Sequence, residues 1–250
     1  MYLYYKKYYI IDSTKSQVTK GVMFIFMEVI WLGQAGLLFI KDGFKIMIDP
    51  YLSDSVKKIN QKNYRRVAVD RTFFEIEPDV MIFTHNHLDH YDPETVSRFI
   101  TADTDMLVLA PSSVWSEVRK IGGGNNYIQF NRHTVWTEKG IKFTAVKAEH
   151  SDITPIGVII DDGDKKYYVT GDTLYNEEIF DDIPNDIYAV FLPVNGVGNN
   201  MNMTDAKRFC ERINPNVAVP IHCGMFDNID MNKFEYKNKV IPKIYEEIKI

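Results

Sequence analysis

Short runs of apolar residues alternate with turn-forming residues from Met27 onward, and this pattern predicts a chain rich in strands. The clearest case is EVIWLGQAGLLFIKDGFKIMIDP, residues 28–50. Within it, the runs LFI and FKIMID flank Lys41-Asp42-Gly43, and an Asp-Gly pair between apolar runs predicts a β-hairpin. The next apolar run, DVMIFT at 79–84, does not alternate and predicts a strand buried on both faces.

Strands and helices continue to alternate through the rest of the chain. Further strands are expected at 106–110, 141–150, 186–194 and 216–224, with a hairpin over 155–172. Helices are expected at 93–100 behind Pro93, at 112–123 with a glycine stop, at 203–215 with Thr204 as N-cap, and over the tail, 238–250. Strands interspersed with helices predict an α/β fold with mixed sheets.

The composition fits a single globular domain. The 250 residues are 45% hydrophobic and 25% charged, and scattered Pro and Gly leave no linker, so we expect one domain over 27–250. Residues 1–26 are expected to be an N-terminal extension or a peripheral strand, with Met23 or Met27 as an alternative start. Lys6 and Lys7 interrupt the apolar residues there, which disfavours a signal peptide.

Charge and cysteine content narrow the range of partners. A net charge of −5 and a pI of about 5.7 disfavour a nucleic-acid partner, and no run of about 18 apolar residues predicts a membrane span. Two cysteines without a CxxC pair favour a reducing cytoplasm. The basic residues of 51–72 are expected to be solvated, with an anion-binding surface as the alternative. A small-molecule substrate is the expected partner, and self-association stays open.

Chemistry concentrates in THNHLDHYD, residues 84–92, which holds three of the six histidines. The pattern is H-x-H-x-D-H, formed by His85, His87, Asp89 and His90. A spacing of two lets His85 and His87 face the same side of extended backbone. A strand end followed by such a loop offers four metal ligands.

Three other candidate ligands also lie at expected strand ends: His150, Asp172 and His222. Ligands of open α/β sheets gather at the carboxyl ends of strands, so we expect these side chains to join the cluster. His133 has no such placement and is interpreted as an ordinary loop residue.

Imidazole and carboxylate ligands together suit Zn²⁺, Mn²⁺, Fe or Co better than Ca²⁺ or Mg²⁺. One ion would take His85, His87 and His150. The second would take Asp89, His90 and His222, and Asp172 would bridge the two. A hydroxide held between two such ions is a nucleophile at neutral pH, as hydrolysis requires.

T-H-x-H-x-D-H, a later histidine, Gly171-Asp172-Thr173 and a terminal P-x-H resemble the metallo-β-lactamase superfamily. The resemblance runs from about Glu28 to Phe226 and implies a four-layer αββα sandwich, two mixed β-sheets flanked by helices, with a dinuclear site at one edge. It implies that Asp89 also orients the nucleophile and shuttles a proton. Asp49 looks like the family's early aspartate, which supports a ligand histidine from behind.

WLGQAGLLFI, FLPVNGVGNNMNMTDAKRF and VAVPIHCGMF are similar to the L-ascorbate-6-phosphate lactonase branch, although that lactonase is longer and differs at Asn86 and Leu88. The expected function is hydrolysis of a lactone or ester of a small metabolite, with or without phosphate, using two Zn²⁺ or Mn²⁺ ions. The alternative is a phosphodiesterase or nuclease of the same fold; a di-iron oxidoreductase and a non-enzymatic subunit are less favoured. Asn195 is expected to contact substrate.

Overall fold

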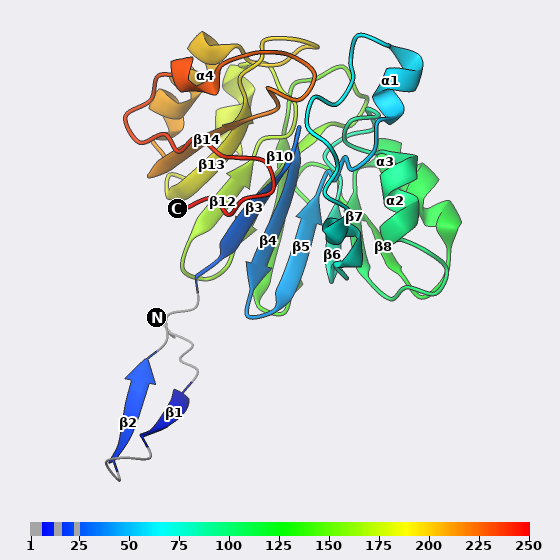
Figure 1. The fold of residues 1–250 in the computed structure, drawn as a ribbon. Helices are drawn as coiled ribbons and strands as arrows, with labels where there is room; N and C mark the ends of the chain where they lie inside the picture. Colours follow the sequence, from blue (N-terminus) through cyan, green and yellow to red (C-terminus); the bar gives the residue numbers. More distant parts are fainter. Residues whose placement is uncertain (1–6, 13–16, 23–25) are drawn as a thin grey trace.

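The computed structural model describes residues 7–12, 17–22 and 26–250, and the strands of 26–250 form two six-stranded sheets packed face to face (Figure 1). One sheet has the order β3-β4-β5-β6-β7-β8 and the other β14-β13-β12-β11-β10-β9. Two helices, α2 and α3, cover the outer face of the first sheet, and α4 covers the second. The expected αββα sandwich is therefore confirmed.

The first sheet begins antiparallel and ends parallel. Its strands are β3 (Glu28–Gly33), β4 (Gly36–Lys41), β5 (Phe44–Ile48), β6 (Val80–Ile82), β7 (Leu107–Ala110) and β8 (Asn126–Gln129). The expected hairpin at Asp42-Gly43 is present, with φ of 54° and 83° at these two residues. Both values lie in the left-handed region that Asp-Gly tolerates well, which is why the turn forms there.

The second sheet has the same mixed character, with antiparallel pairs from β9 to β12 and parallel pairs from β12 to β14. Its strands are β9 (Val135–Glu138), β10 (Ile141–Lys147), β11 (Ile156–Asp161), β12 (Lys166–Val169), β13 (Ile187–Pro193) and β14 (Val217–Ile221). The strands that precede the candidate ligands, β10, β12 and β14, all run in one direction. Their carboxyl ends therefore share one edge of the sheet.

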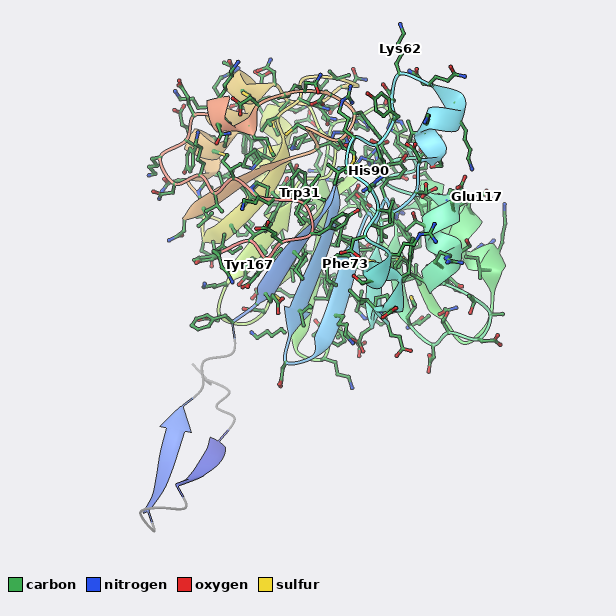
Figure 2. All side chains as sticks on the ribbon, in the orientation of Figure 1. Trp31, Lys62, Phe73, His90, Glu117 and Tyr167 are labelled. Atoms are coloured by element: carbon green, nitrogen blue, oxygen red, sulfur yellow. The ribbon has the colours of Figure 1, made fainter. Side chains whose placement is uncertain are left out.

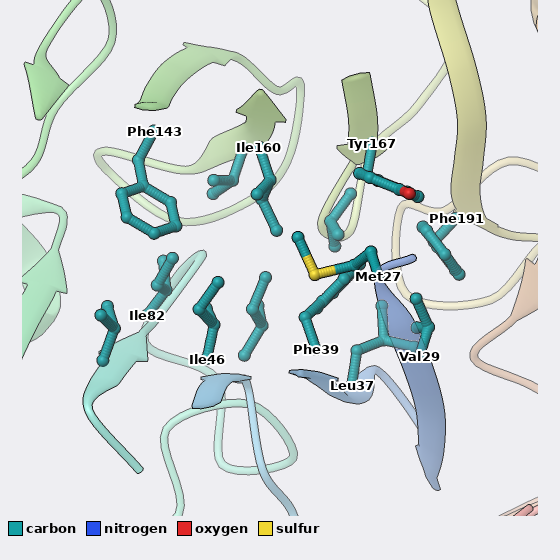
Figure 3. Packing of buried hydrophobic residues seen from close by; sticks show 14 of the residues in the cluster. Met27, Val29, Leu37, Phe39, Ile46, Ile82, Phe143, Ile160, Tyr167 and Phe191 are labelled. Atoms are coloured by element: carbon teal, nitrogen blue, oxygen red, sulfur yellow. The ribbon is translucent and has the colours of Figure 1, made fainter. Parts of the chain in front are cut away.

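The core lies between the two sheets (Figure 3). Leu37 and Phe39 of β4 point into it and meet residues such as Tyr167 and Phe191 of the other sheet, while Leu38 between them faces the layer of α2 and α3. This alternation is the period of two that strand geometry imposes. Because both faces are covered, all three residues are apolar.

The α-helices are α1 (Ser55–Ile59), α2 (Pro93–Phe99), α3 (Ser112–Val118) and α4 (Met203–Ile213). Single 3-10 turns lie at η1 (Arg71–Glu75), η2 (Arg119–Ile121), η3 (Glu177–Asp181) and η4 (Met231–Lys233). The cap expected at Thr204 is wrong: Asn202 caps α4, and its Oδ1 accepts hydrogen bonds from the Thr204 and Asp205 amides at 2.8 and 3.0 Å. None of the helices in the described ranges is long and apolar enough to span a membrane.

The helix expected over 238–250 is also wrong, because the tail is mostly extended, with a turn at 244–245 and no helix. Pro242 cannot donate the hydrogen bond that a helix interior needs. The tail instead bonds to the outer strand of each sheet: Val240 N donates to Ala218 O at 2.9 Å, and Ile248 N donates to Val29 O at 2.7 Å. It thereby covers edges that would otherwise be exposed.

Before this core come β1 (Lys7–Asp12) and β2 (Gln17–Val22), which pair antiparallel with each other. They form a two-stranded sheet of their own among the described strands. The rest of the proposed extension, apart from Phe26, lies outside the described residues. The division at residue 26 therefore stays a proposal.

Asp182 ties three segments together next to the second sheet. Its carboxylate accepts two hydrogen bonds from Arg132 at 2.7 and 2.9 Å and one from Lys147 N at 2.8 Å, and it pairs with His133 at 3.1 Å. Burial alone would raise the pKa of Asp182, but these donors outweigh it and lower the pKa from 3.8 to about 2. The ionised carboxylate therefore stabilises the fold.

Replacing Asp182 by asparagine is expected to lower the free energy of unfolding at pH 7 by about 1–3 kcal/mol, because charged hydrogen bonds are lost. Since the native pKa is the depressed one, the contribution is complete above about pH 4 and is lost as pH falls towards about 2. Urea unfolding of wild type and Asp182→Asn at pH 7 and pH 3 measures how far the difference in their unfolding free energies shrinks at the lower pH. Asp186→Asn, which removes an exposed partner of Lys166, is the control and should change little.

Candidate metal centre

The candidate ligands lie at one edge of the sandwich, where the strands of both sheets end, near His90 in the upper part of Figure 2. Asp49 follows β5 directly and His222 follows β14 directly. His85 and Asp172 come three residues after β6 and β12. His150 was expected to end its strand, but β10 stops at Lys147, where its pairing with β11 ends, and His150 lies in the loop beyond.

His85, His87 and His150 form the first group. One ring nitrogen of each lies within 4.8 Å of the others, and His150 Nε2 is 3.0 Å from His87 Nδ1. The side chains of His85 and His150 are buried, whereas His87 is partly exposed. Solvent therefore reaches this group at His87.

Asp89, His90 and His222 form the second group. His222 Nε2 is 3.1 Å from His90 Nε2 and 3.3 Å from Asp89 Oδ2, and the latter is 3.9 Å from His90 Nε2. A single point lies about 2 Å from all three atoms, which is the length of a zinc–ligand bond. The second group thus has the size of an ion-binding site.

Asp172 lies between the two groups. Its Oδ1 is 3.1 Å from His222 Nε2 and 3.3 Å from His90 Nε2, and its Oδ2 is 3.8 Å from His150 Nε2. Although Oδ1 is close to these nitrogens, it makes no hydrogen bond of acceptable geometry within the described part of the chain, and it is buried. Asp172 therefore lies between the two groups, and its role as a bridging ligand stays a prediction.

The hydrogen bonds behind the rings leave their inner nitrogens free for a cation. His90 Nδ1 donates to Asp49 Oδ2 at 2.8 Å, and His150 Nδ1 donates to Asn199 O at 3.1 Å. In each neutral ring the proton is then on Nδ1, so Nε2 carries a lone pair that faces the centre. Nitrogen lone pairs pointing at one another are unfavourable unless a proton or a metal ion lies between them.

Thr84 extends this arrangement to His85. Its hydroxyl donates to Asp49 and lies 3.0 Å from His85 Nδ1, so it accepts that proton. His85 Nε2 is buried and has no hydrogen-bond partner in the described structure. A buried imidazole nitrogen without a partner fits a metal ligand, and the donor set as a whole fits divalent ions.

The electrostatics favour positive charge at the second group. Burial lowers the pKa of His90, but the carboxylates of Asp172 and Asp49 outweigh burial and raise it well above its usual value. Burial also lowers the pKa of His222, but the carboxylates, mainly that of Asp172, outweigh it and raise this pKa to about 9. The pKa of Asp172 and that of Asp89 are lowered despite burial, chiefly by His222 and by His90 respectively.

At the first group the pKa of His85 is well below its usual value, first because the ring is buried and then because of nearby His90. The pKa of His150 is lowered for the same leading reason. These two rings are therefore neutral at pH 7, the form in which imidazole binds a metal.

Sequence reasoning missed three supporting side chains. Gln34 Nε2 donates to Asp89 Oδ2 at 2.8 Å, and Asn200 Nδ2 donates to Asp172 Oδ2 at 2.7 Å. Asp152 accepts from Asn86 N at 2.7 Å and so holds the loop between His85 and His87. The available signal was position, because all three lie in turns or loops at this edge.

The structure places Asn195 at the site and His133 away from it. The Asn195 side-chain amide is 3.1 Å from His222 Nδ1, so it is at the site, and its contact with substrate stays a prediction. His133 pairs with Asp182 away from the cluster, as an ordinary loop residue would.

Comparison with known proteins identifies a family that matches most of the chain. The family model described as the β-lactamase superfamily domain matches residues 28–222. A UPF0173 metal-dependent hydrolase of Methanopyrus kandleri is 25% identical over 227 residues, which cover 86% of this chain and 91% of that protein. One from Thermoplasma acidophilum is 29% identical over 245 residues, which cover 90% and 99%.

Solved structures show the same fold. Igni18, a metallo hydrolase from Ignicoccus hospitalis, has a TM-score of 0.67 at 22% identity and covers 88% of this chain and 97% of its own. A possible metal-dependent hydrolase from Veillonella parvula has a TM-score of 0.71 at 17% identity, with 91% and 100% covered.

Proposed function

Because the chain belongs to the metallo-β-lactamase superfamily and its relatives are metal-dependent hydrolases, we propose that it hydrolyses a lactone or other ester of a small metabolite, with or without a phosphate group. Two divalent ions, Zn²⁺ or Mn²⁺, would serve the reaction. The observation that carries the proposal is the pair of ligand groups on either side of Asp172. At their centre, His85 Nε2 and Asp172 Oδ1 are buried and have no hydrogen-bond partner among the described residues.

His85, His87 and His150 would hold one ion, and Asp89, His90 and His222 the other, with Asp172 between them. Divalent ions bound there would lower the pKa of water to about 7 and polarise the carbonyl that is attacked. Asp49 and Thr84 hold the proton of His90 and His85 on Nδ1, away from the ions. The rings of His85 and His90 are thus fixed in one tautomer before substrate binds.

Asp89 is suited to move the proton during hydrolysis. Its Oδ2 is engaged by Gln34 and faces His222, and its side chain is 20% exposed, so the carboxylate reaches the mouth of the site. A carboxylate there can take a proton from the attacking water and return it to the leaving alcohol oxygen. Asn195, beside His222, would hydrogen-bond to substrate.

Two features support an ester over a nucleic acid as substrate. The segments WLGQAGLLFI and VAVPIHCGMF are similar to a lactonase branch, and the net charge of −5 disfavours binding of a polyanion.

The test is a panel of substrates offered to protein reconstituted separately with Zn²⁺ and with Mn²⁺. It pairs sugar-acid lactones, with and without phosphate, against a generic phosphodiester. We expect lactone turnover that a chelator abolishes. Turnover of the phosphodiester alone would contradict the ester proposal and favour a phosphodiesterase of the same fold.

A further inference from the structure

We propose that Gln34 is the positioning residue of the second ion site, holding Asp89 and His222 in the arrangement that binds an ion. The inference rests on the proposed two-ion site. Gln34 lies in the turn between β3 and β4, is 2% exposed, and takes no part in the hydrophobic core. A buried polar side chain at an ion site calls for a physical reason.

The main chain of Gln34 holds the backbone of His222 in place. Gln34 O accepts hydrogen bonds from His222 N at 3.0 Å and from the Trp31 indole at 3.0 Å. Gln34 and His222 both have φ in the left-handed region, at 50° and 59°. Such backbone is strained for residues other than glycine and is retained where surrounding contacts determine it.

The side chain of Gln34 holds two ligands of the same ion. Its Nε2 donates to Asp89 Oδ2 at 2.8 Å and lies 3.1 and 3.3 Å from the two ring nitrogens of His222. Because it is nearly equidistant from both nitrogens, the amide nitrogen contacts the imidazole ring as well as the carboxylate, and it thereby joins two ligands of one ion. The amide orientation follows from chemistry: the carboxylate of Asp89 accepts only, so the NH₂ end must face it.

The side chain of Gln34 contacts ligands of the second group and, among the described residues, forms no hydrogen bond with those of the first. None of its hydrogen bonds in the described structure reaches His85, His87 or His150. Loss of the amide should therefore weaken one ion and spare the other. Side chains that orient metal ligands typically contribute a factor of about 10–100 in metal affinity.

The experiment titrates metal-free protein with Zn²⁺ by calorimetry, and with Co²⁺ to follow the absorption of each site. Gln34→Met removes the donor and keeps the volume, and Gln34→Asn keeps an amide too short to reach Asp89. In both we expect the second ion to bind about 10–100-fold more weakly than in wild type, with the first unchanged. Gln61→Met, on an exposed loop, is the matched control and should bind both ions normally.

Two ions bound by Gln34→Met as tightly as by wild type would overturn the role of Gln34, as would equal weakening of both ions. If Gln34→Met does not fold, Gln34→Asn alone decides, because asparagine tolerates left-handed backbone. Wild-type protein that binds fewer than two ions would instead contradict the two-ion site itself. The two failures are therefore distinguishable.

Discussion

Replacing Asp89 by asparagine is expected to lower kcat/KM by about 10³-fold or more, because one substitution removes both an ion ligand and the group that moves the proton. Asparagine has nearly the same size, so the packing around Gln34 and His222 should persist. We therefore expect a folded protein with an unchanged circular dichroism spectrum. Steady-state kinetics on the best substrate of the lactone panel, with the bound metal measured in parallel, gives the result.

A surface variant makes this result specific. Asp103→Asn, on an exposed turn between Thr101 and Thr104, removes the same charge far from the ligands and should leave turnover unchanged. Asp89→Asn that turns over at near the wild-type rate with its metal bound would remove Asp89 from the mechanism. A different group would then have to accept the proton of the attacking water.

Removing metal is expected to have the second large effect: loss of measurable hydrolysis, with a large fall in stability. Asp89 and Asp172 are brought together with five buried or half-buried imidazoles, and cations offset the mutual repulsion of such carboxylates. An ion present at a hundred times its Kd adds about 2.7 kcal/mol to the stability. We expect chelation to lower the unfolding free energy by at least about that amount.

Thermal unfolding before and after dialysis against a chelator measures this change. Zn²⁺ or Mn²⁺ added back should restore both the melting temperature and turnover. His133→Ala, which removes a histidine outside the site, should respond like wild type. Full activity in protein shown by mass spectrometry to hold no metal would contradict a metal-dependent reaction.

Much of the fold followed from local pattern. The hairpin at Asp42-Gly43 and the strand before His85 were predictable because apolar runs and turn residues define them locally. The convergence of His150, Asp172 and His222 was predictable because each follows a strand and strand ends share an edge. The observed clustering is what these patterns imply, whereas the ligand roles stay predictions until metal is measured.

The parts that failed depend on contacts distant in sequence. The tail at 238–250 has a helix-like composition, but bonds to Ala218 and Val29 hold it extended. Gln34 lies 188 residues from His222 and gave no motif, and only its place in a turn at the site edge could have drawn attention to it. Asn202 caps α4 in place of Thr204 because its side-chain Oδ1 accepts hydrogen bonds from two backbone amides.

The most direct test of the central claim is the number of ions per chain. Metal-free protein is reconstituted with Zn²⁺ and, separately, with Mn²⁺, and native mass spectrometry counts what remains bound. We expect two ions per wild-type chain and loss of at least one in Asp172→Ala, since Asp172 lies between both groups. A wild-type chain that binds fewer than two ions, or an Asp172→Ala chain that keeps two with unchanged affinity, would contradict the proposed centre.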